Sequence, residues 1–379
     1  MNKKITAIGL AALFAGLSIG NLCVPDKVYS ERERRYLDQA PSLSWEKVFS
    51  GAFSQEFESY STDQFFYRDQ WVMMKIIAEQ ARQRKDSNGV YFGQDGYLIE
   101  QFDQYDKNQF LKNLEAISRF SQAVLEKTGI PADFLLIPNA SGVLTDQLPF
   151  SAPEIDQAAL FDEADRQVSG FYNVCDALKF HNQEEIYYRT DHHWTSLGAY
   201  YAYEEWRRQK GEEGHSLSFY QTECLTEQFY GTTFSKAGTF ATRPDTIFAM
   251  IPEKGGDIQV EYQFGKKKTD SFYERTHLST ADPYSVFLDG NQPITKITTQ
   301  QKNGKRLMLI KDSFANTFAQ FLLNDYEEIY LIDLRSFQTA VIPYLEQYKI
   351  TDILILYHLK GFCEEKGLFS FDRDQLDLK

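Results

Sequence analysis

Four stretches of the chain are almost continuously apolar, and each ends in polar residues. They read DFLLIPNA (133–140), RLMLIKDS (306–313), EEIYLIDLR (327–335) and DILILYH (352–358). A strand that is apolar at successive positions is buried on both faces, which is typical of a parallel sheet covered by helices. Apolar residues at helical spacing occur before or between these stretches at 107–128, 314–324 and 336–348. The pattern predicts an α/β domain in which helices flank a parallel sheet.

The N-terminus has a different pattern. Lys3 and Lys4 precede an uncharged, mostly apolar run of about 20 residues, the length that a membrane-spanning helix requires. Residues 1–30 are therefore expected to be a signal peptide or a retained membrane anchor, with the rest of the chain outside the cytoplasm. The run is long for a signal peptide and the residues before Glu31 are only a moderate cleavage site, which favours the anchor.

Residues 31–88 combine apolar positions at helical spacing with many polar residues, which predicts short helices leading into the main domain. That domain is predicted to span residues 89–379. It opens on GVYFGQDGYLIE (89–100), which predicts two short strands, since Asp-Gly between aromatic strands is a strong hairpin signal. Residues 215–304 are rich in Thr, Tyr, Phe and Gly, which favours a β-rich insertion forming one wall of a cleft.

Charge and cysteine content narrow the class of protein. The formal net charge of -14 argues against a nucleic-acid partner, because phosphate binding needs a basic surface. Beyond Cys23 the chain has Cys175, Cys224 and Cys363, and their spacing fits neither a disulfide framework nor a zinc motif. We expect no cofactor and no metal ion.

The apolar stretch that ends in Lys311, Asp312 and Ser313 is the first candidate for chemistry. Parallel sheets bind ligands beyond the carboxyl ends of their strands. A serine there has its hydroxyl at the strand tip and its backbone N–H in the first turn of a helix, where an oxyanion can be stabilised. The alternative is that Asp312 and Ser313 only cap that helix.

The stretch TDHHWT (190–195) is the second candidate. A serine hydroxyl becomes a nucleophile when a neutral imidazole, oriented by a carboxylate, removes its proton. Asp191 and His193 supply that pair if they lie side by side ahead of a helix that begins near Thr195. A metal site is one alternative, although adjacent histidines suit one ion poorly. A helix cap built from Thr190, Asp191 and Thr195 is the other.

Four motifs in this order resemble the DHHW family of extracytoplasmic bacterial proteins: YFGQDGYL (91–98), TDHHWT, IKDSFANTF (310–318) and YLIDLR (330–335). That family is similar to the SGNH-hydrolase-like domains of the alginate O-acetyltransferases. The resemblance covers most of the chain from about residue 30. It implies an SGNH-hydrolase-like domain in which Asp191 is the acid, His193 the base and Ser313 the nucleophile.

Two departures from those relatives concern the site. Lys311 stands where they have glycine, and His192 fills the position between the acid and the base, which makes it an alternative base. Further candidates for an oxyanion donor or a substrate contact are Asn139, Asn316 and Arg335. Trp194 is a candidate for stacking on a sugar, with packing in the core as the alternative.

The resemblance implies O-acetylation of a cell-surface or cell-wall polysaccharide, with the acyl group supplied by a membrane-bound O-acyltransferase partner. The same triad would equally serve an acetylesterase, because water and a sugar hydroxyl differ only as acceptors. An anchored glycan-binding protein without catalysis is the remaining alternative, and Lys311 is the feature that favours it.

Overall fold

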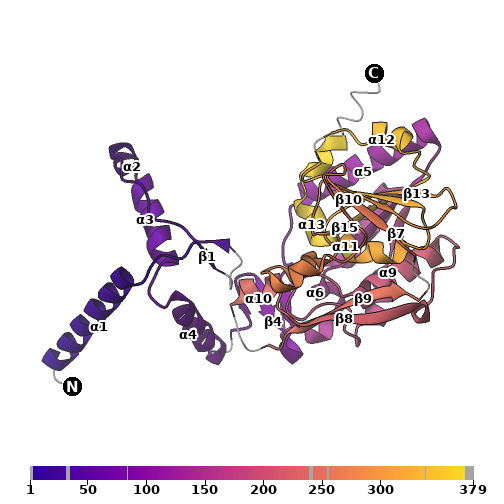
Figure 1. The fold of residues 1–379 in the computed structure, drawn as a ribbon. Coiled ribbons are helices and arrows are strands. Elements are labelled where there is room, and N and C mark those ends of the chain that lie inside the picture. The colour runs from indigo at the N-terminus through magenta and orange to yellow at the C-terminus, as the bar shows by residue number, and fades with distance from the viewer. Residues whose placement is uncertain are drawn as a thin grey trace. The chain divides into compact units, whose positions relative to one another are not determined.

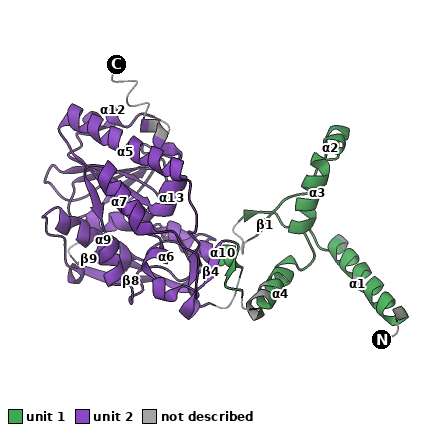
Figure 2. Ribbon diagram, turned by 180° about the vertical axis from the view of Figure 1, so that it is seen from behind, with its two compact units in different colours: residues 1–88, 234–241 green, residues 89–233, 242–379 purple. Residues whose placement is uncertain are grey.

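The computed structural model describes residues 3–30, 35–82, 84–238, 242–253, 256–337 and 339–371. The chain divides into two compact units (Figure 2). The N-terminal unit comprises residues 1–88 and 234–241, and the main unit comprises residues 89–233 and 242–379.

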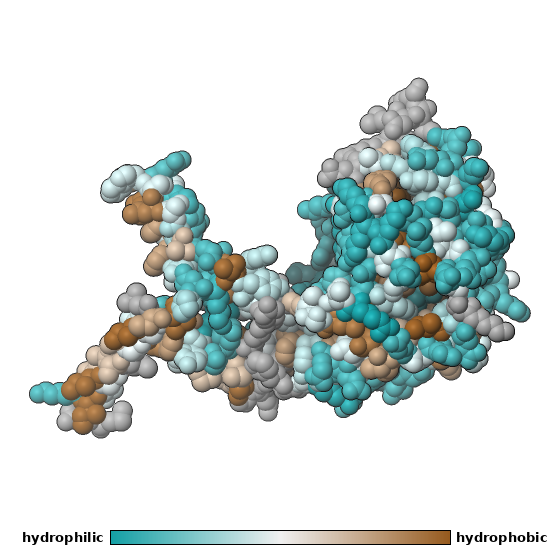
Figure 3. Space-filling view, in the orientation of Figure 1, coloured by the Kyte–Doolittle hydropathy of each residue, from teal (hydrophilic) through white to brown (hydrophobic). Residues whose placement is uncertain are grey.

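The N-terminal unit is mostly helical. Its elements are α1 (Lys3–Cys23), β1 (Tyr29–Ser30), β2 (Arg35–Tyr36), α2 (Trp45–Ser50), α3 (Ala52–Asp63), α4 (Arg68–Ala81) and β3 (Asp86–Ser87). The short helices predicted for 31–88 are present, with two-residue strands beside them. Hydrophobic side chains lie exposed along α1 (Figure 3). Its segment Lys4–Asn21 is long and apolar enough to cross a membrane, and a signal sequence has the same properties.

The main unit is built on an eight-stranded sheet (Figure 1). Its strands lie in the order β11 (Lys267–Thr269), β10 (Gln259–Tyr262), β12 (Ile294–Thr298), β14 (Glu328–Ile332), β13 (Arg306–Lys311), β15 (Asp352–His358), β6 (Ala132–Ile137) and β7 (Phe171–Asn173). The five strands from β14 to β7 are parallel, and the other three extend the sheet antiparallel. The predicted α/β fold is thus confirmed as a mixed fold with a large, mostly parallel sheet.

Helices cover both faces of this sheet, and Figure 1 shows the sheet between α5 (Lys107–Thr128) and α9 (Ser196–Gln209). Leu309 belongs to the core on one face, whereas its neighbours Met308 and Ile310 belong to the core on the other. The first core also contains residues of α9 and α11 (Phe314–Phe318), and the second contains residues of α5, α7 (Gln157–Gln167), α12 (Ile342–Gln347) and α13 (Leu359–Glu364). Burial on both faces is the reason that the strands are continuously apolar.

Local signals explain where the longer helices begin and end. The Asp106 side chain accepts hydrogen bonds from the first turn of α5, and Gly129 ends that helix in a left-handed conformation. The Thr195 side chain accepts from the backbone N–H of Gly198 at the start of α9. The predicted helices over 107–128 and from near Thr195 are confirmed. The other two predicted helices are shorter than expected: α11 continues only as a 3-10 turn over Ala319–Leu322, and α12 begins at Ile342.

The segment 215–304 does not form a single insertion. β8 (Tyr220–Phe229) and β9 (Asp245–Pro252) pair with each other in a two-stranded sheet, whereas β10, β11 and β12 belong to the main sheet.

The predicted hairpin at 89–100 is confirmed as β4 (Val90–Phe92) and β5 (Leu98–Glu100). Three short helices complete the unit: α6 (Ala140–Val143), α8 (Cys175–Phe180) and α10 (Thr232–Ala237), the last of which continues into the N-terminal unit.

Phe318 on α11 is fully buried among Trp194, Tyr203 and Trp206. We expect Phe318→Ala to lower the free energy of unfolding by about 3–5 kcal/mol, because it removes the buried ring and leaves a cavity. Urea denaturation measures this loss. The control Phe180→Ala, at a side chain that is 84% exposed, should change the same quantity by less than about 0.5 kcal/mol. Equal effects of the two substitutions would contradict the assigned core.

Candidate active site

The candidate site lies at the carboxyl ends of the parallel strands, where α/β proteins bind ligands. Ser313 lies two residues after the end of β13 and borders a pocket of about 290 Å³. The residues that line the pocket come from the segments after β13 and β14, from the end of β15 and the segment that follows it, and from the TDHHWT loop: His192, Asp312, Ser313, Phe314, Arg335, Tyr357, His358, Gly361, Glu364 and Glu365. Ser313 and His192 therefore border one pocket, although they are far apart in the sequence.

The TDHHWT stretch is a loop closed by backbone hydrogen bonds. The N–H of Tyr188 donates to the carbonyl of His193, and the N–H of Thr195 donates to the carbonyl of Ile186. Inside the loop, the backbone N–H of His193 donates to Oδ1 of Asp191 at 3.0 Å. This turn, in which an aspartate accepts from the backbone two residues on, is a frequent local structure for Asp. It explains why an Asp-x-His spacing places the carboxylate beside the imidazole.

Asp191, His193 and Ser313 form a continuous chain of contacts. Oδ1 of Asp191 lies 2.5 Å from Nδ1 of His193, and Nε2 of His193 lies 2.7 Å from Oγ of Ser313. An ionised carboxylate only accepts hydrogen bonds, so Nδ1 carries the proton and Nε2 of the neutral ring accepts from the serine hydroxyl. This is the tautomer that a general base for Ser313 requires.

Asp191 is buried and surrounded by donors. Its Oδ2 accepts from the backbone N–H of Thr232 at 2.6 Å and from the Thr232 hydroxyl at 2.9 Å. Burial alone would raise the pKa of the Asp191 carboxyl, but the neighbouring His192 and His193 and these hydrogen bonds hold it well below its usual value. Asp191 is therefore ionised at neutral pH. Neither Thr232 nor its neighbour Gly231 was expected from the sequence.

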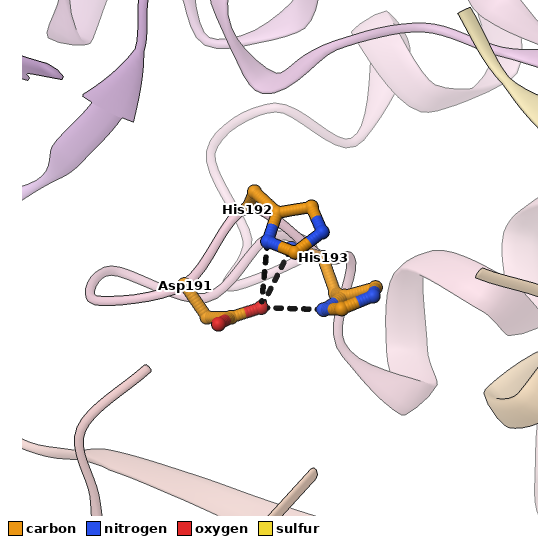
Figure 4. A group of neighbouring side chains, drawn as sticks. All are labelled: Asp191, His192 and His193. Atoms are coloured by element: carbon orange, nitrogen blue, oxygen red, sulfur yellow. Dashed lines mark hydrogen bonds and ion pairs between the residues drawn. The ribbon is translucent and has the colours of Figure 1, made fainter. Parts of the chain in front are cut away.

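His192 has different partners from His193. Its Nδ1 lies 2.7 Å from the Thr232 hydroxyl. The same atom lies 3.5 Å from Oδ1 of Asp191, a contact drawn in Figure 4. Because the hydroxyl donates to Asp191, it accepts from His192, which places a proton on Nδ1 of that ring. The side chain of His192 is 25% exposed and borders the pocket, whereas that of His193 is 7% exposed. The 2.7 Å contact with Ser313 is made by His193.

Asp312, and not Ser313, caps the turn after β13. Its Oδ1 accepts from the N–H of Phe314 at 2.9 Å, and its Oδ2 accepts from the N–H of His358 at 2.7 Å. The Ser313 side chain makes no capping hydrogen bond to α11. The capping alternative therefore applies to Asp312 alone, and the Ser313 hydroxyl is directed to His193.

An aromatic ring that sequence reasoning missed holds the imidazole of His193. The Tyr284 ring stacks on it with centroids 3.8 Å apart and planes 12° apart. The Tyr284 hydroxyl lies 2.7 Å from the Thr317 hydroxyl and 3.3 Å from the Ser313 carbonyl, to which it donates. Tyr284 thus contacts both His193 and the residue that carries the serine hydroxyl. Its only signal in the sequence is its membership of a tyrosine-rich segment.

Of the other predicted site residues, one borders the pocket and three make contacts elsewhere. Arg335 borders the pocket with Ser313. The carbonyl oxygen of the Asn139 side chain accepts from the N–H of Lys360, and the Asn316 side chain donates to Gly290 and Asn291. Trp194 is fully buried and donates to the carbonyl of Phe314, so of its two candidate roles packing in the core applies and sugar stacking does not.

The carboxylate and the two imidazoles also have the composition of a metal site, since one ligand atom from each lies within 4.8 Å of the others. Both oxygens of Asp191, however, already accept hydrogen bonds from the protein, and Oδ1 is in direct contact with Nδ1 of His193. An ion would have to displace these donors. The observed hydrogen bonds suit a carboxylate that orients a protonated imidazole nitrogen better than one that binds a metal ion.

The fold and this cluster define an α/β protein with a large, mostly parallel sheet and an Asp-His-Ser cluster at the carboxyl ends of its strands. A family model described as DHHW protein matches residues 136–332, more than half of the chain. The chain belongs to the DHHW family, and the resemblance seen in its motifs is confirmed.

Three solved structures are similar to this chain. A DHHW family protein from Eubacterium siraeum has 25% sequence identity and a TM-score of 0.63, over 76% of this chain and 96% of that one. PatB1 of Bacillus cereus with a sulfonyl adduct has 19% identity and a TM-score of 0.60, over 73% of this chain and 96% of that one. The O-acetyltransferase domain of Pseudomonas putida AlgJ has 15% identity and a TM-score of 0.46, over 76% and 97%. No curated protein matches the sequence.

Gly231 packs against Asp191 so closely that a Cβ there would lie 2.2 Å from Cβ of Asp191. We expect Gly231→Ala to displace the carboxylate and break its contact with His193. Proton NMR measures this as the loss of the far-downfield resonance of the proton on Nδ1. In the control Gly361→Ala, the new Cβ makes only ordinary contacts, the nearest at 3.5 Å, so the resonance should persist. Its persistence in both variants would show that Gly231 does not hold Asp191.

Lys311 is buried, and burial is the main reason that its pKa falls to about 8 from 10.5. Between these two pH values the unfolded chain keeps a proton that the folded protein has released, so this group stabilises the fold as pH rises. We expect the parent protein to gain about 2 kcal/mol relative to Lys311→Met between pH 8 and pH 10. Urea denaturation at the two pH values measures the difference. A constant difference for Lys311→Met would contradict the lowered pKa.

Proposed function

We propose that this protein is an extracytoplasmic acyl-ester enzyme that O-acetylates a cell-surface or cell-wall polysaccharide. The observation that carries the proposal is the chain of contacts from Asp191 through His193 to Ser313, at 2.5 and 2.7 Å, beside a pocket at the carboxyl ends of the strands. The family and the fold are consistent with an SGNH-hydrolase-like domain over residues 89–379.

In the proposed reaction, Oγ of Ser313 attacks the carbonyl carbon of an acyl donor while Nε2 of His193 takes the hydroxyl proton. Asp191 stabilises the imidazolium that forms, and His193 returns the proton to the leaving group as the carbon–oxygen bond breaks. A sugar hydroxyl then attacks the acyl-serine, giving its proton to His193. Ser313 recovers its proton when the sugar ester leaves.

The developing oxyanion needs hydrogen-bond donors. The backbone N–H of Ser313, at the first turn of α11, is one candidate. The side-chain amide of Asn139 is a second, since its carbonyl oxygen accepts from Lys360 and, among the described residues, its NH₂ group has no acceptor. Asn139 follows β6, which is separated from β13 by β15 alone. Asn316 is a weaker candidate because its NH₂ group donates to Gly290 and Asn291.

The N-terminal unit would place this chemistry at the outer face of a membrane. Its helix α1 supports either a retained anchor or a signal sequence. An anchored enzyme could receive its acyl group from a membrane-bound O-acyltransferase partner. We propose that partner from the family resemblance alone.

Two alternatives use the same site. An acetylesterase differs only in the acceptor, because water replaces the sugar hydroxyl in the second step. A glycan-binding protein without catalysis was suggested by Lys311 in place of glycine. The side chain of Lys311 is turned to Asn291 and lies outside the set of residues that line the pocket, which favours an enzyme.

The proposed nucleophile can be labelled in the full-length chain. We expect a sulfonyl fluoride, a reagent suggested by the sulfonyl adduct of PatB1, to modify Ser313, because His193 removes the proton of its hydroxyl. Mass spectrometry of peptides locates the adduct. Ser313→Ala should abolish it, and His193→Ala should slow it at least about 100-fold. The control Ser336→Ala, at an exposed serine near the same edge of the sheet, should label at the parental rate.

An activated acetyl ester, supplied with and without oligosaccharide acceptors, then distinguishes the enzymes. Acetylated oligosaccharide indicates a transferase, and acetate release alone indicates an esterase. The absence of both an adduct and ester turnover, in protein with a native unfolding transition, would refute the enzymatic proposal.

A further inference from the structure

The pocket beside Ser313 contains a fixed cation that the proposed triad does not use. Arg335 borders the pocket, and its side chain is 43% exposed. Nε and Nη2 donate to the two oxygens of Asp333 at 2.8 and 2.5 Å. This two-point contact fixes the plane of the guanidinium and leaves its remaining N–H groups for another acceptor.

Asp333 is buried and has a second cation beside it. Its side chain is 2% exposed, and Nζ of Lys311 lies 3.9 Å from its Oδ2. The same Nζ donates to the side-chain oxygen of Asn291 at 3.0 Å. Lys311 and Arg335 therefore share one carboxylate. Burial is the first cause of the lowered pKa of Lys311; Asp333 opposes the shift, and repulsion by Arg335 adds to it.

The other carboxylates at this pocket have their own surroundings. Both oxygens of Asp312 accept from backbone N–H groups. Oε1 of Glu365 accepts from the N–H of Gly367, and Glu364 is exposed to solvent. Among the described contacts, the hydrogen bonds and the ion pair of Arg335 go to Asp333, which also has Lys311 beside it. Asp312 and Glu365 act on the Arg335 charge without a direct contact. A negatively charged ligand could accept from the N–H groups of Arg335 that Asp333 does not use.

We propose that the pocket is a subsite for a negatively charged, oxygen-rich group of the substrate, a carboxylate or a phosphate, with Arg335 as the contact residue. Lys311 is a positioning residue that acts through Asp333. The inference rests on the proposed function in one respect: it takes the ligand to be the ester that reacts at Ser313. It also gives Lys311 a role other than the decay of an active site.

Binding can be measured without turnover in full-length Ser313→Ala protein by isothermal titration. The probes are 4-acetoxybenzoate, which carries a carboxylate, and its neutral methyl ester. We expect the anionic probe to bind more tightly. Adding Arg335→Gln should weaken it about 10-fold and leave the neutral probe unchanged, while Arg335→Lys should retain part of the preference. Inorganic phosphate as a competitor distinguishes a site that also takes phosphate from one that is selective for carboxylate.

The positioning role of Lys311 has a separate readout. Lys311→Met should weaken binding of the anionic probe about 3-fold in the Arg335 background and should have no further effect in Arg335→Gln. The groups that act on Lys311 are Asp333, Arg335 and Asp312. Because the anion favours protonated Lys311, its affinity should fall as pH rises through 8 in the parental background and stay constant in Lys311→Met. A substitution that merely loosened the fold would not remove this pH dependence.

The outcomes separate this inference from the proposed enzyme. Equal binding of the two probes, or no effect of Arg335→Gln, overturns the subsite whether or not esters are turned over. An Arg335-dependent preference for the anion in a protein without adduct or turnover upholds the subsite and refutes the catalytic proposal. A preference that Lys311→Met leaves unchanged at every pH overturns the positioning role.

Discussion

The candidate site depends on the hydrogen bonds that the buried carboxylate of Asp191 accepts. A charge removed from water is costly unless donors surround it, and removing one partner leaves that cost uncompensated. The donors come from two distant segments, the loop that holds His193 and the turn at Gly231 and Thr232. The need to satisfy one carboxylate thus brings these segments together. It also sets the direction in which His193 presents Nε2.

A second buried carboxylate organises the other half of the site in the same way. Asp312 accepts from the backbone after β13 and from the backbone at the end of β15. It thereby orders the turn that carries the serine hydroxyl and the start of α13 at once. The two separately ordered halves are in contact where His193 lies 2.7 Å from Ser313. Tyr284 stabilises that contact, because its ring packs on His193 and its hydroxyl donates to the Ser313 carbonyl.

Much of the framework could be predicted because its signals are local. Continuous apolar strands, the caps of α5 and α9 and the hairpin at 89–100 depend on residues close in sequence. The Asp-x-His turn is also local, so the acid and base could be paired before the fold was known. Gly231, Thr232, Tyr284 and Asn291 could not be found, because each matters only through a contact with a distant residue. Spacing alone left two roles open for Trp194, because burial of an aromatic side chain depends on packing that spacing does not describe.

The path of the chain through α10 sets a limit on how the protein can be divided. Thr232, which binds Asp191, is followed two residues later by Phe234, the first residue of the segment that belongs to the N-terminal unit. A fragment that starts at residue 89 would therefore keep residues 234–241 but lose residues 1–88, the rest of the compact unit to which that segment belongs. The disturbance would begin two residues from the donor of the buried carboxylate. Loss of activity in such a fragment could result from the truncation alone. The chemistry of Ser313 therefore has to be measured in the intact chain.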